Sequence, residues 1–272
     1  MSTVRPPAVA GAFYPREPER LAAEIDRLLE EVAAPQASPP KAVIAPHAGI
    51  VYSGPIAASV FCRLAAAHGR VRRVVLLGPS HFVPFRGLAA PPAEVSAFAT
   101  PLGEIPLDRE ALAGLADLPQ IAERGDAHAR EHSLELHLPF LQRVLGKFAL
   151  VPLAVGLAEP EEVAEVLDRL WDGGETVISV STDLSHYLPY ERARRRDRAT
   201  AEAILALRAE AIGRDDACGR EPLRGLLHAA RARGLAAELL DLRSSGDTAG
   251  DRDAVVGYGA FALRPPGGGA AA

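Results

Sequence analysis

Runs of consecutive apolar residues without polar alternation recur along the chain, and they predict buried strands. Three of these runs lead directly into a histidine, namely His47, His81 and His186. Uninterrupted apolar runs are typical of strands that helices cover on both faces. Segments with apolar residues at three- and four-residue spacing lie between them and predict amphipathic helices. This alternation predicts an α/β fold, a single domain with a central mixed, largely parallel sheet flanked by helices.

The element boundaries follow from the same pattern and from the positions of Pro and Gly. Helices are predicted at 18–32, 56–67, 109–115, 133–145, 159–171, 190–210 and 221–233. Strands are predicted to begin at 43, 74 and 177 and to cover 148–153, 236–242 and 254–263. Pro139 falls near the middle of one predicted helix and is expected to kink it. Residues 82–107 are predicted to be a loop-rich pocket wall, residues 1–264 one domain, and residues 265–272 a flexible C-terminal tail.

Composition and charge exclude several classes of protein. The 272 residues are 48% hydrophobic and 24% charged, as in ordinary globular proteins, and the formal net charge is -5. No dense basic cluster supports binding to nucleic acid. The N-terminus lacks the apolar stretch of a signal peptide, and no uncharged apolar window has the length of a membrane span. With only two cysteines, the chain is expected to be a cytoplasmic protein with no membrane contact.

The histidines that follow the strands predict a metal or catalytic site. In sheets of this kind, ligands bind at the carboxyl ends of the strands. His47 and His81 form the strongest pair, because each follows a buried strand through a Pro-containing turn. The third ligand would come from His186 or from Asp247, which follows another apolar strand. Two histidines and one carboxylate are a common ligand set for non-haem Fe(II).

Asp183 and His186 lie three residues apart just after the third run. Asp183 could fix the tautomer of the imidazole and leave His186 as a general acid or base. It could equally cap the next helix, and the two roles are compatible.

Residues 131–137 contain a second group of ionisable side chains, which lacks the H-E-x-x-H zinc pattern. His132 and His137 are five residues apart, so on a helix they would point to different faces. His132 and Glu135 are predicted to line the pocket, with capping of a helix start as the alternative. Tyr52 and Ser244 are placed at the same pocket. Cys218 precedes a helix, but no histidine is adjacent in sequence, so a structural role is favoured.

Several motifs, taken together, resemble the Memo family, whose bacterial and archaeal members are called AmmeMemoRadiSam system protein B. The motifs are Ala8-Val9-Ala10-Gly11-Ala12-Phe13-Tyr14-Pro15, Ala45-Pro46-His47-Ala48-Gly49, Tyr52-Ser53-Gly54, Gly78-Pro79-Ser80-His81, Glu131-His132-Ser133-Leu134-Glu135, His137-Leu138-Pro139, Ser181-Thr182-Asp183-Leu184-Ser185-His186, Cys218-Gly219-Arg220 and Ser244-Ser245-Gly246-Asp247. They occur in order from about residue 5 to 263.

This resemblance implies a fold similar to that of class III extradiol dioxygenases, which open catechol rings with non-haem Fe(II). By position, it implies that His47, His81 and Asp247 are the metal ligands and that His186 is the acid/base. Some relatives place Cys where Asp247 stands. The family name further implies a radical-SAM protein and an Amme-type protein as partners.

Three functions are therefore open at this point. The first is an Fe(II)-dependent, dioxygenase-like oxidoreductase, and iron is favoured mainly by the resemblance, with Zn or Cu as alternatives. The second is a Zn-dependent hydrolase that activates water at the same site. The third is a non-enzymatic scaffold that binds a peptide or an anion. The ligand in each case is an unidentified small molecule or peptide.

Overall fold

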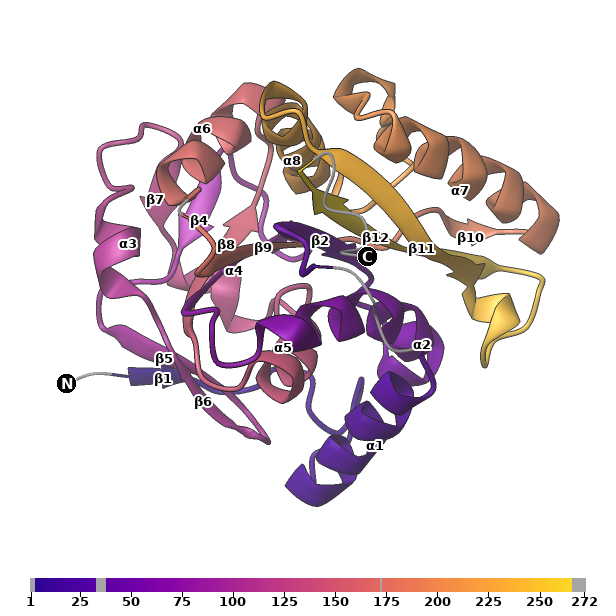
Figure 1. Ribbon diagram of the computed structural model, residues 1–272, viewed down its shortest axis with the longest axis horizontal. Coiled ribbons are helices and arrows are strands. Elements are labelled where there is room, and N and C mark those ends of the chain that lie inside the picture. Colours follow the sequence, from indigo (N-terminus) through magenta and orange to yellow (C-terminus); the bar gives the residue numbers. More distant parts are fainter. Residues whose placement is uncertain (1–2, 33–37, 172, 266–272) are drawn as a thin grey trace.

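Helices and strands alternate along the chain in the computed structural model, which describes residues 3–32, 38–171 and 173–265 (Figure 1). The strands are β1 (Thr3–Arg5), β2 (Ala42–Ala45), β3 (Arg73–Pro79), β4 (Leu88–Ala90), β5 (Val95–Thr100), β6 (Gly103–Pro106), β7 (Ile121–Glu123), β8 (Ala149–Val155), β9 (Thr176–Ser181), β10 (His186–Leu188), β11 (Ala236–Ser244) and β12 (Val255–Arg264). The helices are α1 (Pro18–Glu30), α2 (Ile50–Phe61), α3 (Arg109–Ala113), α4 (Gly125–Ala129), α5 (His137–Leu145), α6 (Pro160–Leu170), α7 (Tyr190–Leu205) and α8 (Arg220–Ala232), with short 3₁₀ segments at Cys62–Ala67, Ala209–Ala211 and Ser245–Asp247.

Nine of the described strands form one sheet, in the order β10-β12-β2-β9-β3-β8-β4-β7, with β11 paired to β12. The central strands β2, β9, β3 and β8 are parallel to one another, whereas β12 joins β2 in the antiparallel sense and β4 joins β8 likewise. The predicted fold class, a mixed and largely parallel sheet flanked by helices, is confirmed. It agrees with the class III extradiol dioxygenase-like fold that the resemblance implies.

Helices cover both faces of this sheet. Helices α2 and α5, with α1 packed outside them, lie on one face, and α6, α7 and α8 lie on the other (Figure 1). Strands β2 and β9 are buried along their whole length, as expected for strands with apolar neighbours on both faces. The buried apolar residues of the described elements form one cluster. The predicted C-terminal tail lies outside the described residues except for Pro265.

Two helices begin at positions that differ from the prediction. Helix α2 begins at Ile50, not at residue 56, and it contains Pro55. Helix α5 begins at His137, so Pro139 falls in its first turn, where a missing N–H costs no intrahelical bond, and the expected kink is not needed.

The segment Ile50–Ala67 is long and apolar enough to cross a membrane, but 61% of it is buried inside the fold, as in the core helix of a soluble protein.

The prediction of a loop at 82–107 is wrong in part. This stretch contains β4, β5 and β6, each only three to six residues long. Strands β5 and β6 form a second sheet with β1, which is parallel to β5. The pairing brings the N-terminal segment beside the rest of the domain, and this contact shapes the functional site.

Candidate metal centre

The parallel strands β2, β9 and β3 deliver three side chains to one edge of the sheet. His47, Asp183 and His81 each stand two residues beyond the last residue of their strand. Because β9 is hydrogen-bonded to both β2 and β3 in the parallel sense, these three positions are neighbours at the carboxyl edge. This is the edge at which ligands bind in open α/β sheets.

Three imidazoles converge at this edge. His47 and His81 are joined by His132, from the segment between α4 and α5, and one potential ligand atom of each lies within 4.8 Å of the others. The rings of His81 and His132 stack with centroids 4.7 Å apart, and the ring of His47 stands edge-on to both. The His47 side is buried, while the His81 side chain keeps 28% of its surface exposed. The centre is therefore open on one side.

Hydrogen bonds fix the tautomer of His47. Its Nδ1 lies 2.8 Å from the Ser181 hydroxyl, which itself donates to the Ser133 carbonyl at 2.6 Å. Because a hydroxyl has one proton, the Ser181 oxygen accepts from His47 Nδ1–H. The Nε2 atom of His47 therefore keeps its lone pair for a ligand.

The buried carboxylate of Glu131 orients the other two histidines. It accepts from Nδ1 of His81 at 2.9 Å, from the His81 backbone N–H at 2.6 Å, and from the backbone N–H groups of His132 and Ser133. Burial opposes its charge, but the hydrogen bond and charge of His81 prevail and lower the pKa of Glu131 to about 2. A carboxylate behind a ligating histidine is the usual second layer of a metal site.

Burial favours the neutral form of His47 and of His132, which is the form that binds metals. Burial lowers the pKa of His47 well below its ordinary value, and the charges of His81 and His132 lower it further. Burial and His81 lower the pKa of His132 as well. The three converging imidazoles fit a transition-metal ion, and imidazole suits Fe, Zn and Cu alike.

Comparison with known proteins shows the family to which this chain belongs. The family model described as "Memo-like protein" matches residues 5–262. The chain belongs to the Memo family. It is 36% identical to a MEMO1 family protein of Methanopyrus kandleri, covering 96% of this chain and 99% of that protein. It is 37% identical to one of Archaeoglobus fulgidus (96% and 100% covered) and 38% identical to one of Methanosarcina barkeri (95% and 99% covered).

A solved structure is similar in fold. The crystal structure of the uncharacterized protein JW3007 from Escherichia coli K12 matches with a TM-score of 0.54 and 13% identity, over 81% of this Memo-family chain and 98% of the other. At this identity, the likeness shows the fold alone.

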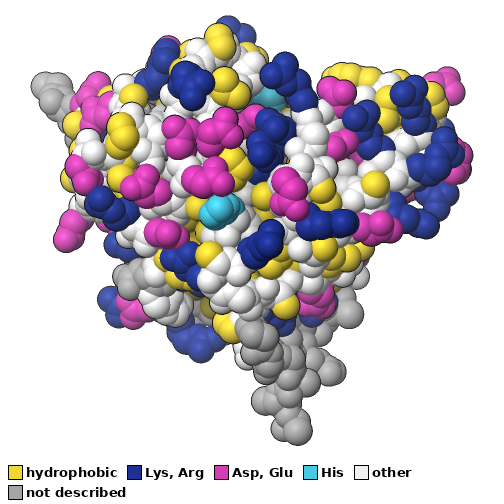
Figure 2. All heavy atoms as spheres, turned by 90° about the horizontal axis from the view of Figure 1, so that it is seen from above, with side chains coloured by type: hydrophobic (Ala, Val, Ile, Leu, Met, Phe, Trp, Pro, Cys, Tyr) yellow, Lys and Arg dark blue, Asp and Glu magenta, His cyan; other side chains and the backbone are white. Residues whose placement is uncertain are grey.

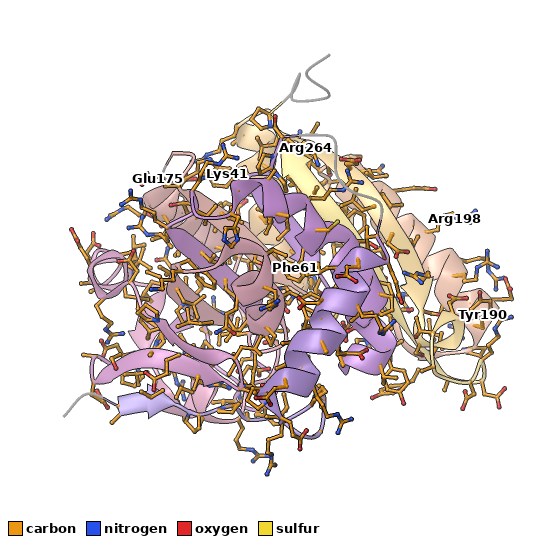
Figure 3. All side chains as sticks on the ribbon, turned by 60° about the horizontal axis from the view of Figure 1, so that its bottom comes forward. Lys41, Phe61, Glu175, Tyr190, Arg198 and Arg264 are labelled. Atoms are coloured by element: carbon orange, nitrogen blue, oxygen red, sulfur yellow. The ribbon has the colours of Figure 1, made fainter. Side chains whose placement is uncertain are left out.

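The structure places Asp247 differently from the ligand position that the resemblance implies. Its carboxylate accepts from the hydroxyl of Tyr190 and from the N–H and hydroxyl of Ser244, both at 2.9 Å. Tyr190 lies at the outer edge of the molecule, away from Phe61 in the core (Figure 3). Partial burial opposes the charge of the Asp247 carboxylate, but the hydrogen bonds from Tyr190 and Ser244 prevail and lower the pKa of Asp247. Among the described residues, His132 takes the third position, and Ser244 caps the turn of Asp247 instead of lining the pocket.

Asp183 lies at the centre, but it does not form the predicted pair with His186. The Asp183 carboxylate accepts from the backbone N–H of His47 at 2.8 Å, and burial raises its pKa. Nδ1 of His186 lies 2.8 Å from the Leu184 carbonyl, which fixes the tautomer in place of Asp183. Nε2 of His186 makes no hydrogen bond within the described residues.

Glu135 is an anchor of the N-terminal segment, which corrects the prediction that it lines the pocket. Its fully buried carboxylate accepts from Arg5 at 2.9 Å, from Tyr14 and from two backbone N–H groups at Ala8 and Val9. All of these donors come from the segment that begins with β1. By contrast, Tyr52 is 39% exposed in the first turn of α2.

Cys218, for which the sequence favours a structural role, lies beside the centre. Its Sγ lies 3.4 Å from Nε2 of His47, although 171 positions separate them in the chain. Burial and the neighbouring Asp183 raise the pKa of this thiol, so it is protonated. No local signal marks such a contact, because it arises only when the turn before α8 meets the end of β2. Phe82 is the other missed neighbour, with its ring 5.9 Å from that of His132.

Two buried histidines behind the centre make stability depend on pH. Burial lowers the pKa of His128 and of His137 to about 4. Below pH 6.5 the unfolded chain therefore binds protons that the folded chain does not, so stability falls as the pH falls from 6.5 toward 4. We expect a loss of roughly 2 kcal/mol per histidine between pH 7.5 and pH 5. Urea unfolding of the metal-free protein at several pH values measures this loss. In a His137→Gln variant, the free energy of unfolding should depend less steeply on pH.

Proposed function

We propose that this Memo-family protein is a non-haem, metal-dependent oxidoreductase of the extradiol dioxygenase type, with Fe(II) held by His47, His81 and His132. One observation carries the proposal: three imidazoles converge at an open edge of the sheet, and hydrogen bonds fix the rings of two of them, His47 and His81. The bound metal would supply Lewis acidity and, as iron, one-electron chemistry toward O₂. We also propose that the protein acts in the cytoplasm, with a radical-SAM protein and an Amme-type protein as partners.

The protein's own residues would do the remaining work. Ser181 holds the ring of His47 and Glu131 holds that of His81 in one orientation, so metal binding would need little rearrangement of these two ligands. His186, with its Nδ1–H directed to the Leu184 carbonyl, presents Nε2 to give or take a proton. Phe82, which is 47% exposed beside His132, provides an apolar rim that excludes water from a bound substrate.

A Zn-dependent hydrolase is the second candidate, and the ligand set itself favours it. With His132 in place of Asp247, the donors are three imidazoles, which is also the set that holds catalytic zinc with an open fourth position. The two candidates therefore share the site and differ in the metal.

The deciding experiment is the metal content of protein purified anaerobically, measured by elemental analysis. We expect close to one iron per chain in the wild type and a loss of at least tenfold in His81→Ala, whose fold is checked by circular dichroism. The matched control is His228→Ala, because His228 is an exposed histidine on α8 whose one ion pair within the described residues is with Glu161, at 3.5 Å. Zinc in place of iron would favour the hydrolase. No metal after reconstitution would refute both and favour a peptide- or anion-binding scaffold.

A further inference from the structure

A cavity of about 300 Å³ lies at the carboxyl edge of the sheet, beside the metal centre. Its walls come from the residues that follow β3, from the end of β8 and from the turn that leads into α8. Strands β3 and β8 are parallel neighbours, so the cavity occupies the next position along the same edge. Its volume is at the lower end of the range for sites that bind small molecules.

The cavity and the metal centre share a wall. Ser80, which lines the cavity, directly precedes His81. Cys218 lines it too, and the Sγ of Cys218 lies 3.4 Å from Nε2 of His47. A molecule in the cavity is therefore separated from a metal ligand by one side chain.

One side of the cavity is apolar. Val83, Phe85 and Val155 contribute to it, together with Leu157, which is 48% exposed. Leu157 is one of few large apolar side chains that the described part of the chain leaves this exposed. A ligand with an apolar body would cover this surface and remove it from water.

The charged residues that line the cavity give it a net positive charge. Arg220 and Glu221 neutralise each other through an ion pair of 2.8 Å. Arg214 also lines the cavity, and within the described residues its guanidinium has no hydrogen-bond or ion-pair partner. The N-terminus of α8, whose N-cap Gly219 provides no side-chain cap, adds a partial positive charge at the same place.

The charge of the cavity is a local feature. On the face seen in Figure 2, basic and acidic side chains are interspersed, with no broad region of one sign. The formal net charge of the whole chain is -5, so no overall field attracts anions. An anion at this cavity would be selected by the unpaired guanidinium itself, through charge-assisted hydrogen bonds.

We propose that this cavity binds a small organic anion, with its apolar body against Phe85 and Leu157 and its anionic group on Arg214. The claim that the cavity binds an anion depends only on the residues that line it. Its role as the subsite that holds the substrate of the metal centre rests on the function proposed above. Under that function, the substrate carries a carboxylate or a similar anionic group at the end remote from the reacting atoms.

Benzoate and its uncharged analogue benzamide test the proposal by isothermal titration of the protein as purified and again after chelation. We expect benzoate to bind more tightly than benzamide, and Arg214→Gln to weaken benzoate binding by about tenfold while leaving benzamide within twofold. Arg195→Gln is the matched control, because Arg195 is exposed on α7 and does not line the cavity; it should leave both unchanged.

Several outcomes would overturn the proposal. Benzoate and benzamide could bind with equal affinity, or the Arg214→Gln variant could bind benzoate as tightly as the wild type. The Arg195→Gln variant could also lose as much affinity for benzoate as the Arg214→Gln variant. Inorganic phosphate serves as a third probe, and binding as tight as that of benzoate would refute the requirement for an apolar body. Metal content measured on the same samples separates the two claims: metal without benzoate binding refutes only the subsite, and benzoate binding without metal refutes only the metal function.

Discussion

Replacing Glu131 with Gln is expected to weaken metal binding by about 10- to 100-fold, the range typical of residues that orient metal-binding histidines. The Glu131 carboxylate accepts four hydrogen bonds, from His81 Nδ1 and from the backbone N–H groups of His81, His132 and Ser133. A Gln side chain has one acceptor oxygen, and its NH₂ group would face at least one of these donors. Two of the three ligand histidines would then lose their fixed orientation together.

Competition with a chelator of known affinity measures this effect, using Zn²⁺ or anaerobic Fe(II). The control is Glu110→Gln, because Glu110 is exposed in α3 and makes no side-chain hydrogen bond or ion pair within the described residues. An affinity within twofold of the wild type in Glu131→Gln would show that this carboxylate does not support the ligands.

Replacing Arg5 with Ala is expected to lower the free energy of unfolding by about 3–5 kcal/mol, because it leaves a buried carboxylate without its partner. Arg5 is 7% exposed, and it pairs with the fully buried Glu135 at 2.9 Å. Its other nitrogens donate to the carbonyl oxygens of His128 and Glu131. The same change therefore also loosens the segment that carries His132, and we expect weaker metal binding in the folded variant.

Urea unfolding of Arg5→Ala beside Arg20→Ala tests this expectation. Arg20 pairs with Glu17 at 3.7 Å on the surface of α1, with side chains 74% and 59% exposed, and such pairs are worth at most about 1 kcal/mol. Equal effects of the two substitutions would mean that the buried pair contributes no more than a surface pair. A double variant, Arg5→Leu with Glu135→Leu, should recover part of the loss, because no unpaired charge then stays buried.

The sequence predicted the central strands well because buried parallel strands have a distinctive composition. His47 and His81 were identified for the same reason: each follows such a strand, and the parallel arrangement brings strand ends together. His132 and His137 have different environments, but the predicted reason does not apply, because His132 precedes α5 and only His137 lies on that helix. His137 packs inward, with Nδ1 on the Ser179 hydroxyl and Nε2 on the Ala45 carbonyl.

The parts that could not be predicted depend on contacts between distant segments. His132 reaches the centre because Arg5 and Glu135 tie its segment to the N-terminal segment, and no periodicity reports such a pairing. Asp247 was proposed from its place after an apolar strand and from the resemblance, but its orientation depends on Tyr190 in α7. The strands β4, β5 and β6 were missed because they are short and separated by Pro and Gly, so their pairing partners define them more than their own composition does.

The order of strands has a consequence for how the protein is made. Strand β9 lies between β2 and β3 in the sheet but follows both in the chain. During synthesis, His47 and His81 therefore emerge long before the strand that sets their separation. Contacts of such long sequence separation form late in folding. The metal would thus be acquired by a nearly finished domain, and a nascent chain that ends before residue 181 would present its histidines without the spacing that selects an ion.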